Sequence, residues 1–464
     1  MMAEKTRTET DSLGEVEITA EAYWGAQTQR AVDNFTVSAF TIPLSMRNAL
    51  AQIKQCAAQV NQQLGLLDTG VAEAIVAACG EILSGKLDHH FPVDVFQTGS
   101  GTSWNMNMNE VIANRANELL GGKRGDKSPV HPNDHVNRGQ SSNDVIPTAL
   151  SMSNRLEAEK LITVLVSLSD ALAARSVEFM DIIKVGRTHL QDAVPITLGQ
   201  EFSGYATQVL KASERIKKVL PELEDLAIGG TALGTGVNTH KEFAAGMVKK
   251  ISEYTGIPFR EAACKFEAIA ARDSQAALAG ALNTVVCSLM KIANDLRLLA
   301  SGPRTGFAEI ELPSLQPGSS IMPGKINPVI PEMMIQVCAH IMGKTTSITV
   351  ACQTGPLDLQ IMQPLLAFET LSALEILANA VHLFEQKCIA GLIADKERCA
   401  QLVDWSLAMV TPLALKIGYD KASKVAFKAF SEKKTVKEVA IQEGFVTSEE
   451  AETVFDPQRM LAPE

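Results

Sequence analysis

Several features that mark common protein classes are scarce in this sequence of 464 residues. Aromatic residues make up only 5% of the chain although 46% of it is hydrophobic, so the core must be mainly aliphatic, as in helical bundles. Basic residues are outnumbered, 42 against 53 acidic ones, and the net charge of −11 argues against a protein that follows nucleic-acid phosphates. If the substrate is anionic, the positive charge that receives it must be local.

The eight cysteines are scattered and form no CxxC pair. We interpret them as buried, reduced thiols rather than a disulfide framework or a zinc site, since several, such as Cys287 and Cys338, lie in apolar helical stretches. No charge-free apolar run reaches the ~20 residues that cross a bilayer, and MMAEKTRTETDS resembles neither a signal peptide nor a presequence. These absences predict a soluble, cytoplasmic protein that binds neither membranes nor nucleic acid.

Long helices dominate what remains. Apolar residues recur at helical spacing over residues 44–65, 70–84, 144–178, 194–226, 266–301, 329–350 and 363–392. The stretch AALAGALNTVVCSLMKIANDLRLLASG is apolar on more than one face and needs more than one neighbour to bury it. We therefore predict a mainly α fold in three domains. Residues 1–140 form a mixed, mostly helical domain, residues 141–393 a central five-helix bundle, and residues 394–464 a small helical domain.

Four breaks between the helices concentrate the polar residues. They read QTGSGTSWNMNMNE (97–110), VHPNDHVNRGQSSND (130–144), GRTHLQDAVP (186–195) and GSSIMPGKINPVIPE (318–332). Each has a plain structural reading: SSND as a helix cap, GSGT as a turn, His189 as a hydrogen-bonded histidine, Glu332 as a first-turn carboxylate. Lys325 has no comparable structural explanation, because no salt-bridge partner lies near it in the sequence. Together the four breaks favour a functional site.

Helix length adds a geometric constraint. A helix of ~30 residues is ~45 Å long, and one such helix separates Ser141–Asn143 from Thr188–His189. If both loops serve one site, they must come from different chains. This argument and the helices with several apolar faces both predict an oligomer.

A metal site is not indicated by the histidines. His131 and His135 bracket Asn133 and Asp134, but Pro132 prevents a regular helical pair of ligands and no third ligand stands out.

The chain resembles the class II fumarate hydratases of the fumarase/aspartase superfamily over essentially its whole length. The resemblance is carried by GEVEITAEAYWGAQTQRAVDNF (14–35), QTGSGT (97–102), HPNDH (131–135), QSSND (140–144), GRTHLQDA (186–193), GGTALGTGVNTH (229–240) and GSSIMPGKINP (318–328). Aspartases tend to read GGAGTS, STND and MPAK where this chain reads TGSGT, SSND and MPGK. The resemblance implies reversible anti hydration of fumarate to (S)-malate through an aci-carboxylate, without metal or organic cofactor. It also implies a homotetramer with a twenty-helix core and active sites shared by three subunits.

The same resemblance implies roles for individual residues. Ser319 matches the catalytic base for the C3 proton of malate, His189 the second acid/base residue, which acts with a bound water, and Glu332 the carboxylate that orients His189. The substrate-binding positions match Ser100, Gly101, Thr102, Ser141, Ser142, Asn143, Thr188, Ser320, Lys325, Ile326 and Asn327. His131, Pro132, Asn133 and Asp134 match a secondary dicarboxylate site. Because a serine hydroxyl is a poor base unless its alkoxide is stabilised, we expect the glycine-rich turn at 318–324 to direct backbone N–H groups inward, with Lys325 near.

Two alternatives remain at this point. One is an ammonia-lyase acting on aspartate, and the other is a catalytically silent helical oligomer built on a lyase scaffold. Two departures from the fumarase pattern bear on rate, affinity and substrate range. Residues 355–364 read GPLDLQIMQP where fumarases resemble GxFELNVxxP, and Trp104 replaces a small polar residue.

Overall fold

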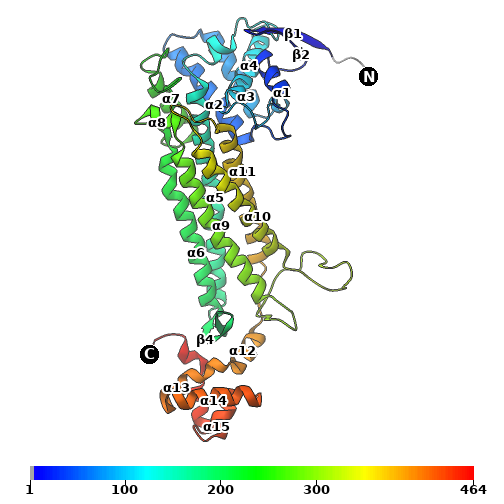
Figure 1. The fold of residues 1–464 in the computed structure, drawn as a ribbon, viewed down its shortest axis with the longest axis vertical. Coiled ribbons are helices and arrows are strands. Elements are labelled where there is room, and N and C mark those ends of the chain that lie inside the picture. The colour runs from blue at the N-terminus through cyan, green and yellow to red at the C-terminus, as the bar shows by residue number, and fades with distance from the viewer. Residues whose placement is uncertain (1–4, 464) are drawn as a thin grey trace. The chain divides into compact units, whose positions relative to one another are not determined.

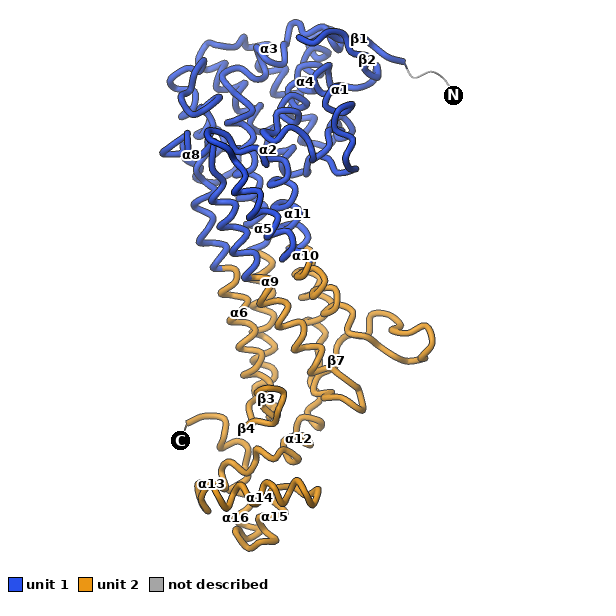
Figure 2. Tube along the Cα trace, viewed as in Figure 1, with its two compact units in different colours: residues 1–162, 214–284, 340–377 blue, residues 163–213, 285–339, 378–464 orange. Residues whose placement is uncertain are grey.

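The computed structural model describes residues 5–463. They divide into two compact units, with residues 5–162, 214–284 and 340–377 in the first and residues 163–213, 285–339 and 378–463 in the second (Figure 2). Five long helices each have residues in both units: α5 (Ser142–Glu178), α6 (Leu198–Val219), α9 (Asp273–Leu299), α10 (Val329–Cys352) and α11 (Gln363–Phe384) (Figure 1). The mainly α fold is confirmed. The division into three domains stays a prediction, because the compact units cut across these helices.

The first unit contains a β-hairpin and a set of shorter helices. Strands β1 (Thr6–Asp11) and β2 (Gly14–Thr19) pair antiparallel, with Thr6 opposite Thr19. The other elements of this unit are α1 (Ala26–Asn34), α2 (Leu44–Gln63), α3 (Thr69–Leu83), η1 (Asp88–His90), α4 (Thr102–Leu119), η2 (Pro132–Val136), η3 (Leu220–Leu223), β5 (Asp225–Leu226), α7 (Phe243–Thr255), β6 (Arg260–Glu261) and α8 (Lys265–Ala270). Strand β5 pairs parallel with β6.

The core of the first unit is aliphatic, as the composition predicts. Helices α2 and α3 pack together and bury Leu50 and Ile53 from α2 with Ile75 and Ile82 from α3. Removing such side chains from water stabilises the fold by about 1.5–3 kcal/mol each. Helix α4, which follows the polar loop at residues 97–101, packs in turn against α3.

The second unit contains a hairpin and the C-terminal helices. Strands β3 (Ile183–Thr188) and β4 (Gln191–Thr197) pair antiparallel, and β7 (Ile310–Glu311) pairs with β8 (Ile393–Ala394). The remaining elements are η4 (Glu385–Ile389), α12 (Lys396–Trp405), η5 (Leu407–Val410), α13 (Thr411–Ile417), α14 (Tyr419–Glu432), α15 (Val436–Gln442), α16 (Ser448–Val454) and η6 (Pro457–Met460). A small apolar core that includes Val185, Leu413 and Val439 joins β3 to these helices.

Two predicted helices have different bounds in the structure. The helix expected over 194–226 begins only at Leu198, because residues 191–197 form strand β4, and Pro221 lies in the short helix that follows Val219. The helix expected over 266–301 is interrupted at residues 271 and 272. There the buried Arg272 donates hydrogen bonds to the carbonyl of Ala268 and to Gln363 Oε1, which holds the break in place.

Two long helices have the length and the apolar composition of a membrane span. They are α9 and the segment Gln363–Ile389, and 56% of the apolar window of each is buried. Residues 274–290 of α9 carry no charged side chain. A helix buried inside a bundle has the same composition.

The cysteine prediction is largely confirmed. All eight thiols are free, and five of them are buried. Burial raises the pKa of Cys56 to about 12 and that of Cys388 to about 12, so these thiols stay protonated and unreactive. Cys264 and Cys287 are exposed in the single chain, and for these two the expectation of burial is wrong.

Candidate active site

The loop at residues 318–327 places two backbone donors on Ser319. The N–H groups of Ile321 and Met322 donate hydrogen bonds to Ser319 Oγ over 3.2 and 2.9 Å. Donors fixed in this way favour negative charge on the oxygen that they contact. The inward-directed N–H groups expected for this turn are therefore present.

The ends of this loop are tied together by three hydrogen bonds. Gly318 N–H donates to the Lys325 carbonyl over 2.8 Å, Lys325 N–H donates to the Met322 carbonyl over 3.3 Å, and Asn327 Nδ2 donates to the Gly318 carbonyl over 2.6 Å. A Cβ atom at residue 318 would lie 2.6 Å from the Lys325 carbonyl oxygen and 2.8 Å from Asn327 N. Glycine is therefore required at this closure, and Gly324 supplies a turn with φ of +80°.

A pocket of about 480 Å³ opens on this loop. Ser319 and Lys325 both line it, together with Ser314, Leu315, Gln316, Pro317, Met322, Pro323, Gly324 and Ile326. Lys325 is exposed, and within residues 5–463 no carboxylate forms an ion pair with it. The pocket thus offers an uncommitted ammonium and a serine hydroxyl to an anionic ligand. Ser320 is exposed beside them.

His189 occupies the tip of the β3–β4 hairpin. Thr188 pairs with Gln191, so the connection consists of His189 and Leu190 alone. Both have positive φ, 57° and 58°, which a two-residue turn of this kind requires and which Asn-Gly normally provides. Holding two non-glycine residues in this region costs about 1–2 kcal/mol each. Such strain is typical of functional turns, and it presents Thr188 and His189 to solvent.

A buried ionic cluster supports the base of this hairpin. Glu309, which is fully buried, accepts from Arg187 Nη1 over 2.9 Å and lies 3.3 Å from Lys184 Nζ. Lys184 also lies 3.2 Å from Glu201 on α6, and the Arg187 guanidinium stacks 4.2 Å from the Phe307 ring. The residue immediately before Thr188 is therefore anchored, so the turn is held in one geometry.

Glu332 lies in the first turn of α10, four residues beyond a proline that precedes the helix. Its backbone N–H donates to the Pro328 carbonyl over 3.1 Å, and its side chain is partly exposed. In the described part of the chain, no hydrogen bond joins His189 to Glu332 or to Ser319. The predicted His189–Glu332 contact is therefore not formed within one chain.

In the first unit, the candidate binding residues gather where α4 and α5 begin. Ser100 Oγ and Thr102 Oγ1 lie 2.8 Å apart, and Gly101, with φ of +73°, precedes the first residue of α4. Ser141 caps α5, because its Oγ accepts from Asn143 N–H over 3.2 Å. The structural reading of SSND as a cap is thus correct, and it leaves the other hydroxyl groups available.

These two helix starts lie side by side. Asn105 Nδ2 on α4 donates to Ser142 Oγ on α5 over 3.3 Å, and a Cβ atom at Gly101 would lie 3.0 Å from Ile146. Asn143 Nδ2 donates to the Ala232 carbonyl over 2.8 Å. Helix N-termini carry unpaired N–H groups and partial positive charge, so hydroxyl-rich residues there favour an anion.

The HPNDH segment forms one turn of π-helix with both histidine rings fixed. His131 Nδ1 accepts from the N–H groups of Asn133 and Asp134, and His135 Nδ1 accepts from His131 N–H. His131 Nδ1 also lies 3.3 Å from Asp134 Oδ2. Burial lowers the pKa of His135, which keeps that ring neutral. Pro132 is buried. Among residues 5–463, no three potential ligands gather at a metal-binding spacing.

One residue from each of the two departures from the fumarase pattern has a structural role. Trp104 is buried, and its Nε1 donates to the Val93 carbonyl over 3.3 Å. Gln360 is fully buried, and its Nε2 donates to the carbonyl of Ala351 over 3.0 Å while its Oε1 accepts from Met362 N–H. Gln360 thus connects the end of α10 to the start of α11.

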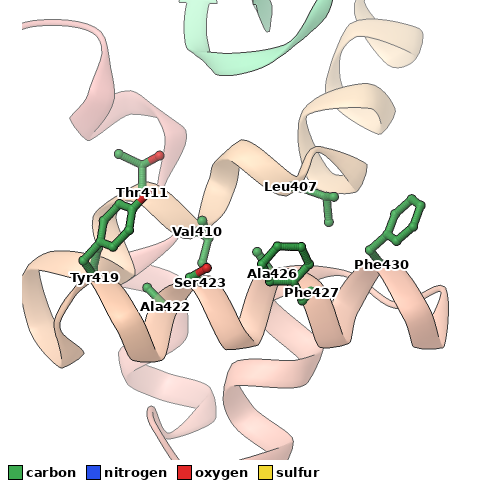
Figure 3. Close-up of a pocket in the computed structure, with 10 residues that line it drawn as sticks. Leu407, Val410, Thr411, Tyr419, Ala422, Ser423, Ala426, Phe427 and Phe430 are labelled. Atoms are coloured by element: carbon green, nitrogen blue, oxygen red, sulfur yellow. The ribbon is translucent and has the colours of Figure 1, made fainter.

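A second pocket, of about 370 Å³, lies among the C-terminal helices (Figure 3). Tyr419, Phe427 and Phe430 line it from α14, opposite Leu407 and Val410. Among residues 5–463, no charged side chain lines it, so these residues offer it no cation to hold a dicarboxylate.

The sequence did not reveal a buried lysine that contacts the loop at residues 137–141, which leads into α5. Lys54 on α2 is fully buried, and its Nζ donates to Asn137 Oδ1 and Gln140 Oε1 over 2.9 and 3.0 Å. Burial lowers the pKa of Lys54 to about 7. Nothing in the stretch QIKQ distinguishes this lysine from a solvent-facing one.

Known proteins now place the chain in a family. Residues 14–343 match the family described as lyase, and residues 409–462 match the one described as fumarase C C-terminus. The chain therefore belongs to the lyase family.

Its relatives within that family carry a more specific name. The class II fumarate hydratase of Methylorubrum extorquens is 50% identical over 460 residues, which cover 99% of this chain and 98% of the relative. The mitochondrial fumarate hydratase of Rattus norvegicus is 49% identical, with 98% and 90% covered.

Solved structures agree with this assignment. The class II fumarase of Schistosoma mansoni has a TM-score of 0.95 and 41% identity, covering 99% of this chain and all of its own. The cobalt-bound fumarate lyase:delta crystallin of Brucella melitensis has a TM-score of 0.95 and 43% identity, with the same coverage.

Proposed function

We propose that the chain is a class II fumarate hydratase that interconverts fumarate and (S)-malate. The observation that carries this proposal is the pair of backbone N–H groups on Ser319 Oγ, beside Lys325, which forms no ion pair within residues 5–463. The names of full-length relatives at about 50% identity support the same activity.

Ser319 is the proposed base. Removing the C3 proton of malate leaves extra negative charge on the adjacent carboxylate, and the barrier falls when fixed donors face that charge. Lys325 supplies an ammonium and Asn327 an amide from the same loop, while Ile326 and Ser320 line the substrate. Ser100, Gly101, Thr102, Ser141, Ser142, Asn143 and Thr188 are the proposed donors for the rest of the dianion.

His189 is the proposed acid/base residue for the departing hydroxyl group, acting through a water. A positioned proton donor of this kind contributes about 10²–10⁴ in rate. Glu332 would orient the imidazole from another chain. Backbone N–H groups fix the rings of His131 and His135, which supports a secondary dicarboxylate site at His131–Asp134.

We also infer a homotetramer whose active sites are shared by three subunits. Helix α5 has 37 residues, so its ends are about 55 Å apart. The Ser141–Asn143 loop at one end and the His189 turn beyond the other cannot meet in one chain. Long helices that leave apolar residues such as Val350 and Leu383 exposed support burial by partner chains in a twenty-helix core.

Purified protein mixed with fumarate tests the activity directly. We expect fumarate absorbance to fall and malate to appear without added ammonium, and to be unchanged by it. Consumption that needs ammonium would instead identify an aspartate ammonia-lyase. No turnover in either condition would identify a silent scaffold. The cytoplasmic location stays a prediction, since the relatives include bacterial and mitochondrial proteins.

A further inference from the structure

Lys54 is an unusual residue to bury. Its side chain is completely inaccessible on α2, yet both acceptors of its Nζ are neutral amides, Asn137 Oδ1 and Gln140 Oε1. A buried ammonium is costly unless its partners are well placed. An aliphatic side chain would pack between α2 and its neighbours without that cost. The lysine therefore serves something that packing alone does not.

The acceptors of Lys54 lie on the loop that leads into the candidate binding residues. Asn137 Nδ2 donates to the Gln140 carbonyl over 3.1 Å, and Gln140 directly precedes Ser141. Asn137 Oδ1 also accepts from Asn105 Nδ2, whose other contact is Ser142 Oγ. One ammonium thus fixes both the loop and the amide that contacts Ser142.

A buried carboxylate holds the same loop from its other side. Asp144 accepts from Ser141 N–H over 2.9 Å through Oδ1, and from Gly229 and Thr231 N–H over 3.0 and 2.9 Å through Oδ2. Its negative charge acts on Lys54 and partly offsets the burial of the ammonium. Hydrogen bonds to Lys54 and Asp144 therefore hold the loop at residues 137–143 from both sides.

We propose that Lys54 is a positioning residue, which fixes the 137–143 loop so that Ser141, Ser142 and Asn143 are preorganised for the substrate dicarboxylate. This rests on the proposed function, since it specifies how the same site binds its substrate. The three binding residues contact substrate in the ground state and in the transition state. Loss of their positioning should therefore raise KM more than it lowers kcat.

The test compares Lys54→Met with Lys344→Met. Lys344 is also a buried lysine of the first unit, but it pairs with Glu369 and contacts none of the candidate binding residues. We expect Lys54→Met to raise KM for fumarate and malate by about tenfold to 100-fold, the scale of a misplaced positioning group. Lys344→Met should keep the parent KM.

A binding measurement separates this proposal from the activity. Malate should raise the Tm of the parent and of Lys344→Met, and should raise that of Lys54→Met much less at the same concentration. If the parent binds malate without turnover, the proposed activity fails while the positioning role is still tested. Equal KM and equal malate shifts in all three proteins would overturn the positioning role.

A milder variant covers the case in which Lys54→Met does not fold. Gln140→Leu removes one acceptor of Lys54, together with the hydrogen bonds that Gln140 Nε2 donates to the Val136 and Arg138 carbonyls, and it leaves α2 intact. It should raise KM in the same direction, and a parent-like KM would refute the proposal.

Discussion

Replacing Ser319 with alanine is the sharpest test of the catalytic loop. The substitution removes the oxygen that accepts from Ile321 and Met322 N–H, and it leaves Lys325 in place. The loop is solvent-facing in the single chain, and its closure depends on Gly318, Lys325 and Asn327 rather than on Ser319. We therefore expect an unchanged fold and Tm.

The size of the effect follows from the two hydrogen bonds. A neutral hydrogen bond contributes about 0.5–1.5 kcal/mol and one to a charged group about 1.5–3 kcal/mol. Two donors thus favour the alkoxide over the hydroxyl by about 2–3 kcal/mol, or about two pKa units. That is too little to make serine a base near neutral pH, so Lys325 and the closed site must supply the rest.

Ser319→Ala should therefore lower kcat by about 10²–10⁴, the contribution of a positioned proton-transfer group. The assay is fumarate formation from malate, with exchange of the malate C3 proton in D₂O as a second readout. Ser314→Ala is the matched control, because Ser314 lines the same pocket and has no proposed role. Near-normal malate dehydration by Ser319→Ala would refute the assignment of Ser319 as the base.

Three further predictions follow from named contacts. Gly318→Ala should abolish most activity without a large change in Tm, because its Cβ would lie 2.6 Å from the Lys325 carbonyl oxygen. Gly324→Ala is the control: no atom lies within 4 Å of its Cβ, so only the positive φ of residue 324 should lower the activity. Equal losses of activity in the two variants would contradict this. His189→Asn should lower kcat by about 10²–10⁴ and keep the parent Tm, because asparagine tolerates the positive φ of this turn. Leu190→Asn is the control and should stay active. An inactive Leu190→Asn would show that the geometry of the turn, rather than the imidazole, determines the activity. The third concerns pH: burial lowers the pKa of Lys54 to about 7, while the unfolded chain keeps this proton to about pH 10.4. The unfolded state therefore binds more protons between these values, so this group raises the free energy of unfolding as pH rises from 7 to 10. In Lys54→Met, Tm should therefore rise less between pH 7 and 10 than in the parent protein. The same dependence of Tm on pH in both proteins would contradict this prediction.

The helices were predictable where their apolar periodicity is long and unbroken. Boundaries failed where a tertiary contact decides the local structure. Residues 191–197 pair with β3 instead of extending α6, and Arg272 interrupts what reads as one helix by bonding to Ala268 and Gln363. Neither the strand pairing nor the hydrogen bonds of Arg272 can be predicted from the apolar periodicity of the sequence.

The motifs predict which residues form the candidate site, and that assignment stays a prediction, whereas the groups that support these residues could not be predicted from the sequence. The loop at 318–327 shows the inward N–H groups that its glycines suggested. His-Leu does not resemble a turn with two positive φ values, because Asn-Gly is the usual sequence there. Glu309 and Lys54 are charged residues in ordinary contexts, and only three-dimensional packing buries them behind the site.

The central claim is that separate chains jointly build one active site around the substrate dianion. Mixing chains that carry His189→Asn with chains that carry Lys325→Ala, each inactive alone, measures this directly. If the two residues reach each site from different subunits, equal mixing and reassembly should restore about one quarter of the parent activity, since half the subunits at each of two positions are intact. Hybrid tetramers that stay inactive would contradict the account.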